Sequence, residues 1–154
     1  MYRKILITTD GSAVSRQTAY AGVELARQLG AEVLVLYVAP AYQYPVYVEI
    51  VPPAYPSEED YSQHMLNTGA GHTGPIVEAA RNAGLASDSM TVFGESPAAT
   101  IVSVAEERNC DLIFIGSHGR SGWGQLLLGS VTNKVLSHTT KPVLVHRLIA
   151  EPSS

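Results

Sequence analysis

The sequence predicts a three-layer α/β fold, in which helices cover both faces of a doubly wound, five-stranded parallel sheet. Short β-branched and apolar runs alternate with helical patterns along the 154 residues. The apolar residues of one such run, Glu32–Ala39, are continuous rather than alternating, as in strands buried on both faces of a parallel sheet. We expect strand order 3-2-1-4-5 in one domain over residues 1–148, with a flexible tail at 149–154.

The first strand is expected at Lys4–Thr9, because this run is apolar and β-branched and ends at an Asp-Gly-Ser turn. Ser12 suits the N-cap of a helix that reaches about Leu29. Gly30 follows at the position where a left-handed residue commonly ends a helix. The run Glu32–Ala39 is then the second strand.

The second half of the chain repeats this alternation. Ser96 and Pro97 open a helix with a cap residue followed by proline, and that helix ends near Asn109. A further helical pattern covers Val131–Leu136. The remaining strands are expected at Ser89–Phe93, Leu112–Ile115 and Pro142–His146.

The segment Pro40–Tyr61 has a distinct composition, with five of the nine prolines and five of the eight tyrosines. Proline disfavours regular structure, whereas tyrosine rings favour burial. We therefore expect a long loop packed on the edge of its own sheet. A lid over a binding crevice or a partner surface is the alternative.

The next stretch combines a strong helix start with several helix breakers. Ser57 precedes three acidic residues, which favour a helix N-terminus. Three glycines and Pro75 then interrupt the pattern before it resumes at Ile76–Ala83. The sequence predicts two helical pieces or one kinked helix.

Bulk composition excludes several classes of function. A formal net charge of −4 argues against nucleic acid as a partner. The single cysteine, Cys110, excludes an internal disulfide and is expected in the core of a protein from a reducing compartment. No apolar run approaches the roughly 20 residues that span a bilayer, and Met1 precedes the first strand too closely for a signal peptide. We expect a cytoplasmic protein without a protein-built metal site, because the five histidines lack metal-ligand spacing.

One glycine motif points to a ligand. Gly116-Ser117-His118-Gly119 follows a predicted buried strand, and nine residues later Gly129-Ser130 opens a predicted helix. Glycine lets a ligand approach the backbone, and the first N–H groups of a helix attract anions. The motif therefore predicts binding of a phosphorylated small molecule, in a crevice that Asp10 shares if the first and fourth strands are neighbours. Taken singly, these residues also fit ordinary roles as a strand end, a helix cap and a turn aspartate.

The chain resembles the universal stress protein family from about Met1 to Arg147. The resemblance is carried by Thr8-Thr9-Asp10-Gly11-Ser12, by Gly94-Glu95-Ser96-Pro97 and by the closing Lys141–Val145. It is also carried by the complete pattern Gly-x2-Gly-x9-Gly-Ser, the signature of the members of the family that bind ATP. The resemblance implies a Rossmann-like fold of the adenine nucleotide alpha hydrolase type, with ATP as ligand and Mg²⁺ carried by the nucleotide.

The resemblance also implies roles for ten residues. Thr9 and Asp10 contact adenosine, with Asp10 bonding the ribose or reaching a metal ion, and Val38 faces the adenine ring. The residues that line the ribose and the first phosphates are Ile115, Gly116 and Gly119. Those that hold the terminal phosphates, through N–H groups and two hydroxyls, are Gly129, Ser130, Val131 and Thr132.

On this basis we expect a nucleotide-dependent sensor or switch in stress response, with no catalytic residues. The alternative is a slow ATPase or an autophosphorylating phosphotransferase with Ser130 or Thr132 as acceptor. Against a dedicated enzyme, the lysine of a P-loop is absent. His118 and Arg120 can face the phosphates or solvent, and Trp123 is expected to anchor the loop. Relatives in the family pair as homodimers through the final strand, which implies the same for Val143–Val145.

Overall fold

The sheet has the predicted architecture. The computed structural model describes residues 1–45, 55–117 and 128–148 of the chain. All strand pairings are parallel and the strand order is β3-β2-β1-β4-β5, which confirms the predicted fold class and order. The strands are β1 (Lys4–Thr9), β2 (Glu32–Pro40), β3 (Ser87–Gly94), β4 (Leu112–Gly116) and β5 (Val143–His146).

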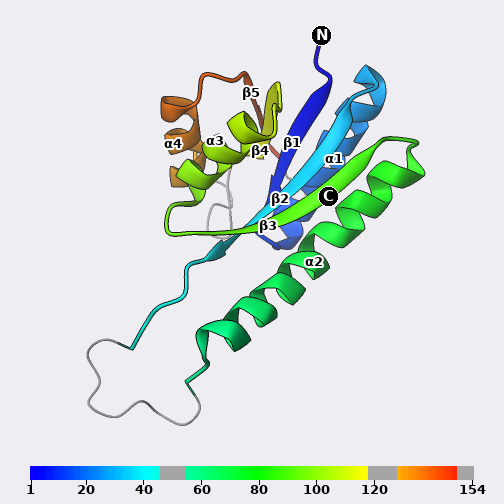
Figure 1. Ribbon diagram of the computed structural model, residues 1–154. Helices are drawn as coiled ribbons and strands as arrows, with labels where there is room; N and C mark the ends of the chain where they lie inside the picture. Colours follow the sequence, from blue (N-terminus) through cyan, green and yellow to red (C-terminus); the bar gives the residue numbers. More distant parts are fainter. Residues whose placement is uncertain (46–54, 118–127, 149–154) are drawn as a thin grey trace, which may run out of the picture.

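Helices cover both faces of the sheet. They are α1 (Ala13–Leu29), α2 (Glu58–Asn82), α3 (Pro97–Glu107) and α4 (Ser130–His138). Helices α1 and α2 lie on one face and α3 and α4 on the other (Figure 1). Because successive residues of a strand point to opposite faces, β1 contributes to two cores. Ile5 and Ile7 pack with α1 and α2, whereas Leu6 packs with α3.

The direction of winding reverses at β1. This strand pairs with β2 on one side, where Ile5 is in register with Val33, and with β4 on the other, where Ile5 is in register with Leu112. In a doubly wound sheet, such a reversal leaves a crevice beyond the carboxyl ends of the two central strands. The fold therefore brings the end of β1 and the end of β4 to one place, as the sequence predicted.

The predicted helix caps are confirmed. The Ser12 hydroxyl accepts a hydrogen bond from the Ser15 N–H at 3.1 Å. Ser57 and Ser96 cap α2 and α3 in the same way. Gly30 ends α1 in the left-handed region, at φ 64°. Each cap satisfies N–H or carbonyl groups that the helix ladder leaves open, so the local sequence determines these boundaries.

Helix α2 is continuous from Glu58 to Asn82, so the predicted division into two pieces is wrong. Its buried face, with Ile76 and Val77, packs against the sheet, and this burial outweighs the low helix propensity of glycine. Gly69 lies directly against Thr91 of β3, where an added Cβ would overlap the threonine side chain. Pro75 lies inside the helix and frees the Gly71 carbonyl, but Gly71 is exposed and water can bond that oxygen.

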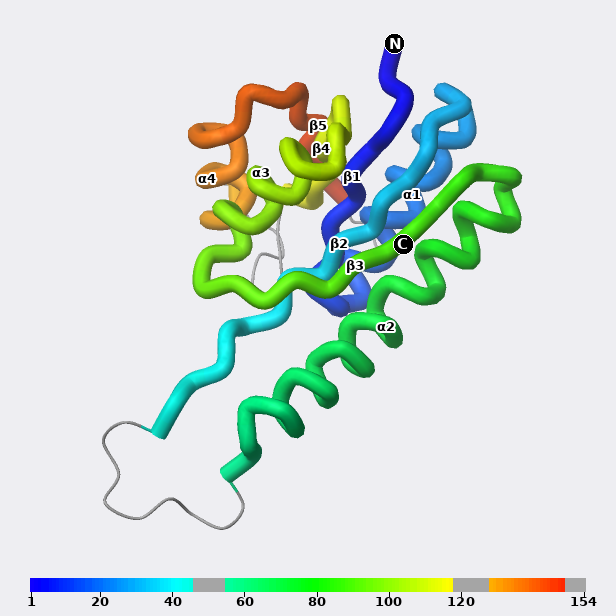
Figure 2. The backbone as a smooth tube through the Cα atoms, viewed as in Figure 1, coloured from blue at the N-terminus to red at the C-terminus, as the bar shows by residue number. Residues whose placement is uncertain are grey.

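The described residues between β2 and α2, together with the first turn of α2, form an extension that we call the tyrosine arm, residues 41–45 and 55–61. Its base packs on the sheet edge, where the ring of Tyr61 lies 6.4 Å from that of Phe93 in β3. Beyond this base, the described residues project away from the sheet (Figure 2). Four tyrosine hydroxyls donate hydrogen bonds in the arm, from Tyr42 to Pro56, from Tyr61 to Pro40, from Tyr44 to Glu58 and from Tyr55 to Gln43.

Other predictions have simpler outcomes. Cys110 is buried in the core beneath α3, and burial raises the pKa of its thiol. Within the described residues, no helix combines the length and apolar character that crossing a bilayer requires. The predictions for the tail at 149–154 and for His118, Arg120 and Trp123 lie outside the described residues.

Candidate functional site

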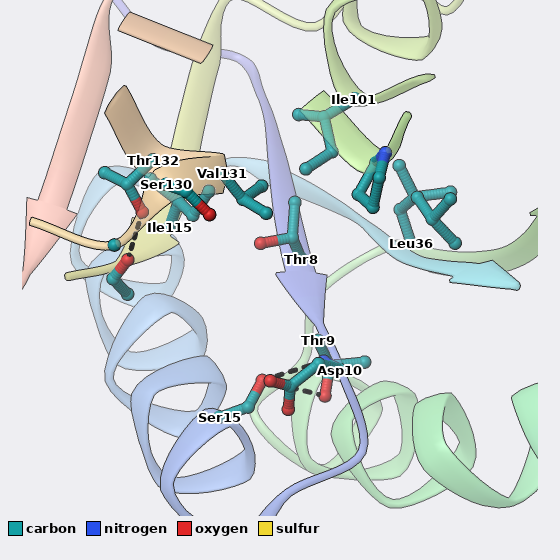
Figure 3. A pocket seen from close by; sticks show the side chains of 14 residues that line it. Thr8, Thr9, Asp10, Ser15, Leu36, Ile101, Ile115, Ser130, Val131 and Thr132 are labelled. Carbon is teal, nitrogen blue, oxygen red and sulfur yellow. Dashed lines mark hydrogen bonds between the residues drawn. The ribbon is translucent and has the colours of Figure 1, made fainter. Parts of the chain in front are cut away.

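A cavity of about 370 Å³ lies at the carboxyl ends of β1, β2 and β4, where α3 and α4 begin (Figure 3). This volume is within the ~300–1,000 Å³ range of small-ligand sites. Nine of the ten predicted binding residues line it, and the tenth, Gly119, lies outside the described residues. The nine are Thr9, Asp10, Val38, Ile115, Gly116, Gly129, Ser130, Val131 and Thr132.

The first turn of α4 forms one wall of the cavity. Gly129 is its N-cap and, having no side chain, makes no side-chain cap bond. The first hydrogen bond of the helix ladder runs from the Asn133 N–H to the Gly129 carbonyl at 3.0 Å. The N–H groups of Ser130, Val131 and Thr132 therefore precede the ladder, and they carry the partial positive charge of a helix start.

Two hydrogen bonds fix this turn to the end of β4. The Gly129 N–H donates to the Ser117 carbonyl at 2.7 Å. The hydroxyl of Thr132, which is buried, donates to the Gly116 carbonyl at 2.8 Å. Because a hydroxyl has a single proton, Thr132 has none left to donate to a phosphate while this bond is made. Of the two hydroxyls expected to hold phosphate, that of Ser130 is exposed and makes no hydrogen bond within the described residues.

The turn after β1 forms the opposite end of the cavity. The Asp10 carboxylate accepts a hydrogen bond from the Ser12 N–H at 2.9 Å, and the Asp10 N–H donates to the Ser15 hydroxyl at 3.0 Å. Gly11 has φ +84°, a backbone conformation that residues with a side chain rarely adopt, and it lies against the ring of His72. A Cβ at this position would also overlap that ring. Asp10 thus has the local turn role and also lines the cavity.

Thr9 and Ser15 continue this hydrogen-bond network. The Thr9 hydroxyl oxygen accepts from the Gly11 N–H at 3.2 Å and from the Ser15 hydroxyl at 3.1 Å. Both acceptor positions of Thr9 are then used, which leaves its proton for another acceptor. The network fixes the backbone of the turn that carries Asp10.

The wall on the α3 side is apolar and includes residues that the sequence analysis missed. Leu36 of β2 lies beside the predicted Val38, and Pro97 and Ile101 of α3 close the cavity above them. Strand alternation was the available signal for Leu36, because it lies on the same face as Val38. The positions of Pro97 and Ile101 depend on how α3 packs, which no local pattern specifies.

The other missed residues are Ser15 and Thr8. The side chain of Thr8 points to the α3 side of the sheet, whereas that of Thr9 points to the α1 side and reaches Ser15. The predicted residue Thr9 therefore faces away from the apolar wall, and its neighbour Thr8 faces the α4 end of the cavity (Figure 3).

Charge is sparse around the cavity. Among its described lining residues, Asp10 carries the only ionisable side chain. No group of three or more His, Cys, Asp or Glu side chains suited to a metal ion occurs in the described part of the chain. The arrangement offers backbone amides for an anion, an apolar wall for a ring and one carboxylate for hydroxyl groups or a cation.

Comparisons with known sequences agree on one family. A family model for the universal stress protein family matches residues 1–147. The chain is similar to the universal stress protein MJ0531 of Methanocaldococcus jannaschii, with 34% identity over 94% of this chain and 82% of the relative. It is also similar to the universal stress protein YxiE of Bacillus subtilis, with 31% identity over 96% and 100% of the two chains.

Solved structures share the fold over nearly the whole chain. The protein MJ0577 of Methanocaldococcus jannaschii matches with TM-score 0.79 and 27% identity, covering 98% of this chain and 99% of that one. A universal stress protein of Archaeoglobus fulgidus in complex with dAMP matches at 0.64 and 21%, covering 94% and 97%. A family protein of Arabidopsis thaliana with AMP bound matches at 0.66 and 16%, covering 96% and 93%.

Proposed function

This chain belongs to the universal stress protein family, and on that premise we propose that it binds an adenine nucleotide in the cavity between β1, β4 and α4. The observation that carries the proposal is the uncapped first turn of α4 at the wall of that cavity. An anion at such a helix start gains about 0.3–1 kcal/mol, and up to ~2 kcal/mol where it is partly buried. The AMP and dAMP bound by two proteins of the same fold support the ligand class.

The polarity of the cavity supports a definite orientation of the ligand. The apolar wall of Leu36, Val38 and Ile101 suits the faces of a purine ring. The amides of Ser130 and Val131 suit phosphate oxygens. The ribose then lies between them, along Ile115 and Gly116, with Thr9 and Asp10 at the adenosine side as the family resemblance implies.

We take ATP as the ligand that the complete glycine motif favours, with Gly119 contributing as the resemblance implies. The negative charge of a triphosphate is larger than the partial positive charge that the first amides of α4 provide. Mg²⁺ prefers carboxylate and phosphate oxygens, and Asp10 supplies a carboxylate at the cavity. The cation would arrive with the nucleotide, held by phosphates and by Asp10.

In the cell, the role that fits this site is a nucleotide-dependent sensor or switch in the cytoplasm, acting as a homodimer. The half-buried edge strand β5, with Val143, Leu144 and Val145, is the pairing surface in this proposal. An apolar edge strand with unpaired backbone groups favours pairing with a second chain.

The substitution Gly129→Val tests the binding site. Gly129 has φ −61° and ψ 156°, which valine adopts readily, so the variant adds a side chain at the phosphate without backbone strain. We expect ATP affinity to fall by at least about tenfold, measured by calorimetry, which corresponds to roughly 1.4 kcal/mol. Gly74→Val is the matched control, because a Cβ at Gly74 of α2 meets open space. Equal ATP binding by wild type and Gly129→Val would remove this turn as the phosphate site.

A further inference from the structure

Thr8 of β1 is one of the strand residues that line the cavity. In β1 it follows Leu6 on the face that packs with α3, and in the β1–β2 pairing it is in register with Leu36. Leu36 and Ile115 also point to this face. The strand floor of the cavity is thus apolar except at Thr8, which is half-buried.

The Thr8 hydroxyl differs from the other hydroxyls around it that are buried or half-buried. Thr9, Ser15 and Thr132 each hydrogen-bond to the protein. Within the described residues, the Thr8 hydroxyl makes no hydrogen bond. Figure 3 shows its oxygen turned toward the first turn of α4 and away from Ile101 and Leu36.

A hydroxyl in this place has an energetic cost. Valine has the same shape as threonine and would pack on Leu36 without removing a polar group from water. Partial burial of a hydroxyl without a protein partner is unfavourable, and native buried polar groups nearly always have a partner. The contents of the cavity supply the partner of Thr8, which is water in the free protein or a ligand that displaces that water.

We infer that the Thr8 hydroxyl donates a hydrogen bond to the phosphate group nearest the sugar, and so makes the cavity selective for a nucleotide over the corresponding nucleoside. This inference rests on the proposed nucleotide binding. It places the first phosphate between Thr8 and the amides of Ser130 and Val131, with the base against Leu36 and Ile101. A hydrogen bond to a charged group is worth more than one to a neutral group, so phosphate gains the most from this hydroxyl.

The test compares Thr8→Val with Thr8→Ser, which keeps the hydroxyl. The affinities of each protein for AMP and for adenosine are measured by NMR titration, which also measures weak binding, and the Tm is measured without ligand. We expect Thr8→Val to bind AMP about tenfold more weakly than wild type and adenosine within about twofold. Thr8→Ser should bind AMP within about threefold of wild type. The Tm of Thr8→Val should equal or exceed that of wild type, because the substitution removes only an unpartnered hydroxyl.

Two binding results overturn the inference. One is AMP binding by Thr8→Val that matches wild type, and the other is an equal loss for AMP and adenosine, which would place the contact on the nucleoside. A fall in Tm parallel to the loss of affinity would make Thr8 structural and contradict it too. Failure of the wild type to bind AMP, ADP or ATP is a different result, since it rejects the proposed function itself.

Discussion

The cavity and the tyrosine arm both extend from the carboxyl edge of the sheet, and both concentrate polar side chains, but they use them differently. In the arm, the hydroxyls of Tyr42 and Tyr61 each donate to a carbonyl at 2.6 Å. In the cavity, the hydroxyls of Thr8 and Ser130 and the first amides of α4 have no such partner within the described residues. Engaged groups stabilise the fold, whereas groups left open at a cavity are available to a ligand.

This difference separates two kinds of substitution. Changes in the arm or at its base should alter the free energy of unfolding or the local opening of α2 and leave nucleotide affinity intact. Changes at open groups of the cavity should alter affinity and leave stability intact. Thr132 combines features of both kinds of site, because it lines the cavity but its hydroxyl donates a hydrogen bond to the Gly116 carbonyl.

The largest expected contrast between two variants concerns the packing of α2, whose first turn belongs to the arm. Gly69→Ala places a methyl group against Thr91 of β3, and such overpacking costs about 1–3 kcal/mol, offset by about 1 kcal/mol of helix propensity. Gly71→Ala, two residues away, meets open space and should stabilise the protein by about 0.5–1 kcal/mol. Urea denaturation measures both. Equal effects of the two variants would contradict the close packing at Gly69, and ATP affinity should change in neither.

The next effect is at Thr132. Thr132→Val removes the bond to the Gly116 carbonyl while keeping the side-chain shape, and should lower the free energy of unfolding by about 1–2 kcal/mol. Because that bond fixes the first turn of α4, AMP affinity should fall as well. Thr8→Val differs from this variant, because it is expected to lose AMP affinity without any loss of stability. Loss of affinity by Thr132→Val without loss of stability would break the distinction between engaged and open hydroxyls.

The smallest effect concerns pH and the arm. The hydrogen bond from Tyr44 to the Glu58 carboxylate raises the pKa of Tyr44, and burial raises the pKa of Tyr42. A raised folded-state pKa stabilises the arm below the ordinary tyrosine pKa of about 10, and that contribution is lost as pH rises through the folded-state value. A pH titration that follows tyrosine absorbance should therefore show, in wild type, tyrosines that ionise late, at a pH above the ordinary tyrosine pKa.

Two variants identify those groups. Tyr44→Phe should remove one late ionisation from the titration, and Glu58→Gln should shift that ionisation to lower pH. AMP affinity at neutral pH should be the same in both variants as in wild type. An unchanged titration in Tyr44→Phe would show that the bond to Glu58 does not hold the arm in solution.

Local patterns of the sequence predicted most of the fold. The cap residues Ser12, Ser57 and Ser96 act within three residues of themselves, so they could be identified without the structure. The continuous apolar run of β2 likewise indicated its burial on both faces. The continuity of α2 could not be predicted, because it depends on the burial of Ile76 and Val77 against strands that are distant in sequence.

The candidate site divides in the same way. The glycine motif and Asp10 could be found from the sequence because each marks the end of a strand. Alternate residues of β1 face the two different cores, so the register of the strand decides whether Thr8 or Thr9 faces the apolar wall. The sequence analysis named Thr9, whereas Thr8 is the residue on that side. Pro97 and Ile101 enter the cavity through the packing of α3, which only the three-dimensional structure supplies.

The most direct test follows backbone amide signals by NMR while AMP is added to the protein. The amides of Ser130, Val131 and Thr132 should shift most, together with those of Thr8–Asp10, and the amides of Tyr42, Tyr44 and Tyr61 should not move. Shifts confined to the arm, or saturating AMP without any shift at the start of α4, would contradict the assignment of this turn as the phosphate site.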